Sequence, residues 1–174
     1  MSTLESALIV VVPEAAPAVD AWREQACKAK PSAGVPPHIT LLYPFVPAGE
    51  IDDTLVDELG ELFARFAPFS FALREARRFP GALYLSPEPG EPFVALTKAI
   101  ATAHPDYPPY AGTVDSIVPH LTVAEGDDEL LDEVERDLAA ALPIGVAASE
   151  VLLLEEVRPD LEWRVRARLP IGGE

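Results

Sequence analysis

The sequence predicts an α+β protein built from two similar halves, about residues 1–80 and 81–174, within a single domain. The first observation is a repeat: Pro-His-Ile-Thr-Leu at 37–41 returns as Pro-His-Leu-Thr-Val at 119–123. The second is that both halves predict the same order of elements, namely strand, helix, motif strand, helix and strand. The third is that the 174 residues are 49% apolar, which is enough for the core of one domain or of two tightly joined lobes.

The first half begins with a short β-branched run that ends at a proline, a pattern typical of a buried strand. Apolar residues at helical spacing follow, with Pro17 in the first turn, where proline is tolerated. A proline-rich loop then leads to the motif strand, to a helix with a clear apolar stripe, and to a strand of alternating apolar and polar residues. The expected ranges are strand 6–12, helix 14–29, loop 31–37, motif strand 38–43, helix 51–66 and strand 69–78.

A Pro-Gly pair at 80–81 predicts the turn that leads into the second half. A loop rich in proline and tyrosine precedes the second motif strand, and an acidic helix with an apolar stripe follows this strand. Two strands joined by a turn at 158–160 close the chain. The expected ranges are strand 82–86, helix 93–103, loop 105–113, motif strand 117–124, helix 128–142, and strands at about 147–157 and 161–169.

Strand geometry makes the repeat a candidate site. Alternate side chains of a strand point to opposite faces, so His38 and Thr40 share one face, and His120 and Thr122 share another. The aliphatic residues between them then point into the core. Because the two copies lie about half a chain apart, we expect each half to contribute one histidine and one threonine to a shared site.

Paired histidines and threonines suit the opening of a phosphodiester. Histidine has an ordinary pKa of about 6.5, so one ring can take a proton from water while the other gives one to the departing sugar oxygen. Threonine hydroxyls can donate hydrogen bonds to the phosphate oxygens. One histidine in a strand is more simply an ordinary hydrogen-bonded residue, and only the pairing favours catalysis. Zinc is the other use of paired histidines, but catalytic zinc usually takes three protein ligands, and no such set is spaced around them. We therefore expect no metal and no cofactor.

The two motifs resemble those of the 2H phosphoesterase superfamily, also called the 2′-5′ RNA ligase-like or LigT-like family. The similarity lies in His-Ile-Thr-Leu-Leu-Tyr-Pro-Phe at 38–45, in Pro-His-Leu-Thr-Val-Ala at 119–124, and in a closing hairpin that carries Trp163. The resemblance implies two lobes related by a pseudo-twofold axis, each with an antiparallel sheet and helices on the outer side, and an active cleft between them. It also implies hydrolysis of cyclic phosphates or 2′-5′ linkages without a metal, with His120 as the base and His38 as the acid.

Further residues are candidates for substrate contact. Tyr84 and Tyr110 can stack a nucleobase, although half-buried structural tyrosines explain them more simply. Arg77 and Arg164 can supply positive charge, although arginines on hairpin strands more often lie on solvated faces. Tyr43 has the register opposite to His38, so we expect it in the core.

The charge limits the partners. The net charge is −16, with 13 basic against 29 acidic residues, which argues against a broad surface for long nucleic acid. A small cyclic nucleotide or an RNA end remains compatible with this charge. So does an alternative function, in which the protein is a non-enzymatic module that binds a nucleotide or phosphorylated metabolite in the same cleft. The longest apolar run, residues 7–12, is far shorter than the ~20 residues of a membrane span. We therefore expect a cytoplasmic monomer that does not bind membranes.

Overall fold

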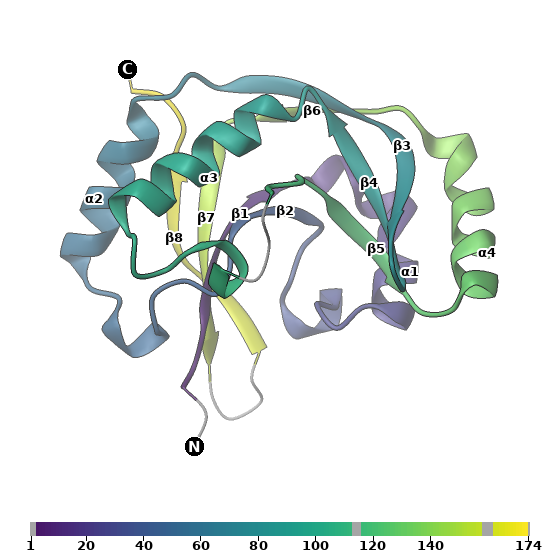
Figure 1. Cartoon of the computed structure of the whole chain (residues 1–174), viewed down its shortest axis with the longest axis horizontal. Coiled ribbons are helices and arrows are strands. Elements are labelled where there is room, and N and C mark those ends of the chain that lie inside the picture. Colours follow the sequence, from purple (N-terminus) through teal and green to yellow (C-terminus); the bar gives the residue numbers. More distant parts are fainter. Residues whose placement is uncertain (1–2, 113–115, 158–161, 174) are drawn as a thin grey trace.

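The computed structural model describes residues 3–112, 116–157 and 162–173, which form two four-stranded antiparallel sheets and four α-helices (Figure 1). The first sheet has the order β2-β1-β7-β8 and the second has the order β5-β4-β3-β6. The strands of the first sheet are β1 (Ser6–Val11), β2 (His38–Leu42), β7 (Glu150–Val157) and β8 (Glu162–Pro170). Those of the second sheet are β3 (Phe69–Phe79), β4 (Ala82–Glu88), β5 (Leu121–Glu125) and β6 (Ile144–Ala148). The α+β prediction is confirmed.

The two sheets have matching layouts. Each places its motif strand, β2 or β5, at one edge, beside the strand that begins the corresponding repeat, β1 or β4. The sheets do not follow the division of the chain near residue 80, however, because β3 joins the second sheet whereas β7 and β8 return to the first. Each sheet therefore contains strands from both halves of the chain.

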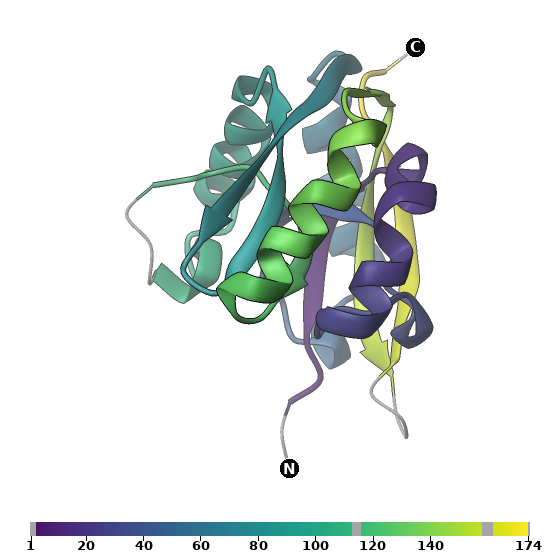
Figure 2. The ribbon, with the colours of Figure 1, turned by 90° about the vertical axis from the view of Figure 1, so that its right-hand side faces the viewer.

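The helices tie the two sheets together. They are α1 (Ala16–Ala26), α2 (Asp53–Ala64), α3 (Glu91–Ala103) and α4 (Asp128–Leu138). Helix α1 follows β1 of the first sheet yet packs on β5 of the second, and α3 follows β4 of the second sheet yet packs on β2 of the first. Helices α1 and α4 lie side by side (Figure 2), and α2 packs on β8. The larger of two hydrophobic clusters contains residues from both sheets and all four helices.

Local sequence explains where these helices begin. Asp52 accepts a hydrogen bond from the backbone N–H of Leu55 at the start of α2, and Asp127 accepts one from Leu130 at the start of α4. Helix α1 is shorter than the predicted 14–29, because residues 13–15 form a 3-10 turn and Cys27 is extended. Helix α4 is also shorter than predicted, since a 3-10 turn at 139–141 precedes Pro143.

Two predicted strand boundaries are wrong. The single strand expected at about 147–157 is two strands, β6 and β7, which separate at Ser149 and belong to different sheets. The second motif strand begins at Leu121 and not at 117. The turn predicted at 158–160 lies outside the described residues. In the part of the chain that the structure describes, no helix is both long and apolar enough to cross a membrane.

Candidate functional site

The fold brings the two motifs together at the sheet edges. Strands β2 and β5 contact each other, although they belong to different sheets. Along each motif the burial alternates as predicted: Ile39 and Leu121 are completely buried, whereas the histidines and threonines on either side of them are only partly buried. The aliphatic residues therefore anchor each motif in the core and leave the histidines and threonines partly exposed.

Both histidine rings are held in the same way. The Nδ1 atom of His38 lies 2.8 Å from the carbonyl oxygen of Pro36, and the Nδ1 atom of His120 lies 2.6 Å from that of Val118. A carbonyl oxygen only accepts, so each Nδ1 carries a hydrogen and donates it. The Nε2 atom is then the one whose protonation changes, and it is a base in the neutral ring and an acid in the charged ring. The two motifs thus present chemically equivalent groups.

Burial favours the neutral form of both rings. Burial is the largest cause of a His38 pKa of about 4; the hydrogen bond to Pro36 acts in the opposite direction, and the positive charges of Arg23 and of a protonated His120 add to the lowering. Burial also lowers the pKa of His120. The charge of a protonated His120 is the smallest of the causes that lower the pKa of His38.

A cavity of about 340 Å³ opens beside the first motif, on the face of the first sheet that carries His38 and Thr40. Tyr43 and Trp163 form an aromatic part of its wall, with ring centres 6.1 Å apart in an edge-to-face arrangement. Glu156 and Lys28 also line it. The cavity offers apolar rings for a planar group and charged side chains for polar atoms, and it is large enough for part of a nucleotide.

The second motif lies against aromatic rings. The ring of His120 meets Phe79 and Tyr84 edge to face, with centres 5.0 and 5.6 Å away, and Tyr110 stacks on it at 6.4 Å. The backbone N–H of Tyr110 also donates to the carbonyl oxygen of Tyr43, so this loop joins the surroundings of the two motifs. Three aromatic rings thus contact the imidazole of His120.

The predicted substrate contacts differ in their positions. Tyr84 is only 6% exposed and stacks on Phe79, so it supports His120 and has little surface left for a base. Arg77 shares its sheet face with Tyr84 and Thr122 but is exposed and paired with Glu75.

Arg164 pairs with Glu155, and both point away from the cavity, because their neighbours Trp163 and Glu156 line it. Strand alternation therefore places Arg164 on the face of the first sheet opposite the cavity, and its contact with a substrate stays a prediction.

Some residues of the site have no clear signal in the sequence. The register of the first motif predicts Tyr43 in the core, but this residue follows the end of β2, where strand alternation no longer holds, and it lines the cavity. Its hydroxyl donates to Glu5, and burial raises its pKa. Lys28 and Glu156 lie more than a hundred positions apart in the chain, and only the fold places both in the wall of this cavity. Within the described ranges, no group of three His, Cys, Asp or Glu side chains is arranged to hold a metal ion.

Comparison with known proteins is consistent with this architecture. The sequence profile of the 2′-5′ RNA ligase superfamily matches residues 11–160. A search of curated protein sequences finds no match. Among solved structures, the protein TT0787 of Thermus thermophilus superposes with a TM-score of 0.62 at 23% identity, covering 98% of this chain and 99% of that one. E. coli LigT in complex with 3′-AMP gives a TM-score of 0.58 at 17% identity, covering 99% and 100%, and LigT in its apo form gives 0.60 at 16% with the same coverage. At these identities the structural likeness establishes the fold.

Proposed function

Because the chain belongs to the 2′-5′ RNA ligase superfamily, whose profile matches most of its length, we propose that it is a metal-independent phosphoesterase. Its substrate is a small cyclic phosphodiester, such as a 2′,3′-cyclic nucleotide or the cyclic phosphate at an RNA end, or a 2′-5′ linkage. The observation that carries this proposal is the matched pair of histidines: each Nδ1 is occupied by a carbonyl oxygen, which leaves each Nε2 for proton transfer.

The chemistry proceeds in one displacement at phosphorus. The neutral histidine takes a proton from water through Nε2, and the water oxygen forms a bond to phosphorus. The bond from phosphorus to one ribose oxygen breaks, and the protonated histidine gives its Nε2 proton to that oxygen. The products are a phosphomonoester and a free hydroxyl. Thr40 and Thr122 donate to the non-bridging oxygens, where negative charge accumulates.

The cavity beside His38 suits the nucleoside part of such a substrate. Tyr43 and Trp163 provide a wall for a base, and the Glu156 carboxylate can accept hydrogen bonds from amino or hydroxyl groups. E. coli LigT, which shares the fold, has been crystallised with 3′-AMP and with NADP+. These complexes support a ligand of nucleotide size for this chain.

A turnover assay tests the proposal. The four 2′,3′-cyclic mononucleotides and a 2′-5′ dinucleotide are incubated with the protein, with His38→Ala and with His120→Ala, and the products are resolved by chromatography. We expect turnover by the parent protein and its loss in both variants. Tight calorimetric binding of a nucleotide without any turnover would instead identify the chain as a binding module.

A further inference from the structure

The cavity beside the first motif has two ends along the first sheet. The motif end is lined by His38 and Thr40, and the aromatic end is lined by Tyr43, Glu156 and Trp163. The strand register separates these ends, because β1 pairs with His38 at Val11 and bonds to Glu156 six residues earlier, at Glu5. A nucleotide whose phosphate lies at the motif end would therefore place its base at the aromatic end.

The Glu156 carboxylate is held in place at the aromatic end. The backbone N–H of Glu156 donates to the carbonyl oxygen of Glu5 at 2.9 Å, and the backbone N–H of Glu5 donates to Oε2 of Glu156 at 2.8 Å. Among the described residues, no donor is hydrogen-bonded to the other oxygen, Oε1, and no basic side chain forms an ion pair with Glu156. The residue thus presents a fixed acceptor to the cavity.

The aromatic rings at this end do not distinguish one base from another. Tyr43 and Trp163 meet edge to face, and the Tyr43 hydroxyl is already used, because it donates to the carboxylate of Glu5. Stacking on aromatic rings tolerates every base, since each base has a π-face. Discrimination between bases therefore has to come from the polar groups around the rings.

The four bases differ in what they offer to a carboxylate, which only accepts hydrogen bonds. Guanine has two neighbouring donors on one edge, N1–H and the N2 amino group. In adenine and cytosine the amino group neighbours a ring nitrogen that accepts, and in uracil the single N–H lies between two carbonyl oxygens. A carboxylate such as that of Glu156 therefore pairs best with guanine and is repelled most by uracil.

We propose that Glu156 makes the site selective for guanine by accepting hydrogen bonds from N1–H and the N2 amino group of the base. The inference rests on the proposed phosphoesterase function and names its substrate class, namely nucleotides that carry guanine beside the cyclic phosphate. Lys28 is exposed in the same cavity wall, and a lysine amine binds a phosphate as a point charge whatever the base. Of these two charged groups, Glu156 is thus the one that reads the base.

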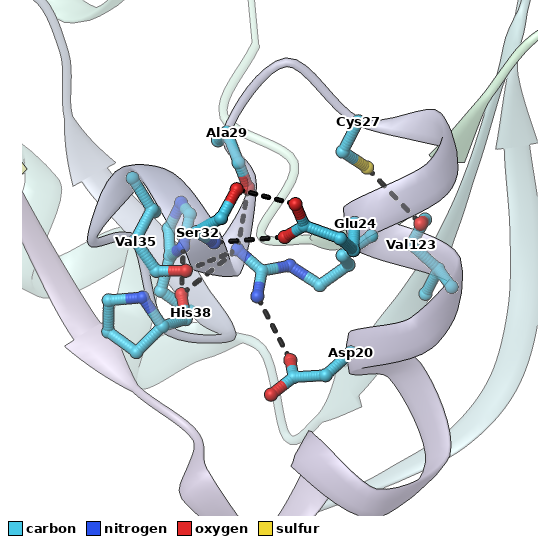
Figure 3. Close-up of polar contacts among 10 residues, drawn as sticks. Asp20, Glu24, Cys27, Ala29, Ser32, Val35, His38 and Val123 are labelled. Atoms are coloured by element: carbon cyan, nitrogen blue, oxygen red, sulfur yellow. Dashed lines mark hydrogen bonds and ion pairs between the residues drawn. The ribbon is translucent and has the colours of Figure 1, made fainter. Parts of the chain in front are cut away.

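The loop between α1 and β2 forms another part of the cavity wall and is also held in place. Its residues Ala29 and Val35 line the cavity, and their carbonyl oxygens accept from Nη2 of the buried Arg23 at 2.8 and 2.9 Å. Glu24 accepts from the backbone N–H and the hydroxyl of Ser32 in the same loop (Figure 3). Fixed walls favour selectivity, because a carboxylate that cannot move away is left facing the carbonyl oxygens of a wrong base.

Replacing Glu156 by glutamine tests the proposal. The N–H of Glu5 still needs an acceptor, so we expect the amide oxygen of Glu156→Gln to take the place of Oε2 and the NH2 group to face the cavity. The kcat/KM ratio of guanosine to uridine 2′,3′-cyclic phosphate should be about tenfold or more in the parent protein and should be reversed in the variant. Any effect of the lost charge on the phosphate is common to both substrates and cancels in this ratio.

Glu162→Gln is the matched control. Glu162 is exposed in β8 beside Trp163, so strand alternation places it on the face opposite the cavity, and its replacement removes the same charge. The control should leave the guanosine-to-uridine ratio unchanged. A parent protein without preference for guanosine, or a change by one common factor for all four cyclic nucleotides in Glu156→Gln, would overturn the proposal.

Calorimetry with guanosine, inosine and uridine 3′-monophosphates separates this inference from the proposed function, and it needs only the parent protein. Inosine lacks the N2 amino group, so the affinity should fall from guanosine to inosine to uridine. If this order appears while no cyclic phosphate is turned over, the phosphoesterase function fails and the guanine site stands. If cyclic nucleotides are turned over but the three monophosphates bind equally, the guanine site fails and the phosphoesterase function stands.

Discussion

Replacing His38 by asparagine should remove a defined pH dependence from the stability of the fold. Asparagine carries an N–H near the position of Nδ1, so it can still donate to the Pro36 carbonyl, but it does not titrate. In the parent protein the pKa of His38 is lowered from an ordinary value of about 6.5 to about 4 in the folded state.

The sign follows from proton linkage. Below pH 6.5 His38 becomes protonated in the unfolded chain, whereas in the folded chain it stays neutral down to about pH 4. The folded state therefore loses stability as the pH falls through this window. A lowering from 6.5 to about 4 corresponds to a loss of about 1 kcal/mol at pH 5.5 and about 3 kcal/mol at pH 4. Above pH 7 the contribution disappears.

Urea denaturation of the parent protein and of His38→Asn at pH 7, 5.5 and 4 measures this effect. The carboxylates of the acidic surface titrate in both proteins and cancel in the difference. We expect the variant to gain stability relative to the parent as the pH falls, by about 3 kcal/mol between pH 7 and pH 4. Parallel pH profiles for the two proteins would refute the reasoning that burial holds His38 neutral.

Four further predictions concern activity and folding. His38→Ala and His120→Ala should each lower kcat/KM by ~100-fold or more, and the alanine variants of the two motif threonines should lower it less, because they leave proton transfer intact. Chelation by EDTA should leave the rate unchanged, and a rate that EDTA abolishes and added zinc restores would contradict the mechanism. The substrate preference should favour mononucleotides over long RNA at low salt, as a kcat/KM length series measures. Gly34→Ala should lower Tm more than Gly81→Ala, because both have positive φ but only Gly34 is in close approach to Trp163.

The local features of the site are readable from the sequence. Alternation in a strand places His38 with Thr40 and His120 with Thr122, and the burial of Ile39 confirms it. The repeat also predicts two matching strand layouts, as the sheets show. These features depend on a few neighbouring residues, and local pattern determines them.

The remaining features depend on distant contacts. The run at 147–157 is expected as one strand, and nothing local shows that its two ends pair with different sheets. Arg23 lies in a helix whose polar residues are expected at the surface, and its burial follows from the path of the loop between α1 and β2, whose carbonyl oxygens accept its hydrogen bonds. Lys28 and Glu156 line one cavity only because β7 returns to the first sheet. Local sequence patterns do not predict contacts between residues that lie far apart in the chain.

The electrostatics of the site run against those of the whole protein. A net charge of −16 favours protonated histidines everywhere on the surface, yet both motif histidines are held towards the neutral form. Burial is the larger cause in each ring, and at His38 the buried charge of Arg23 acts in the same direction at close range. Surface charges act over longer distances and are screened within about 8 Å at physiological salt. In the proposed mechanism, an anionic phosphate bound between the rings would reverse this balance, since it favours a proton on one of them. On that proposal, we expect the histidine pair to acquire its acid when the substrate binds.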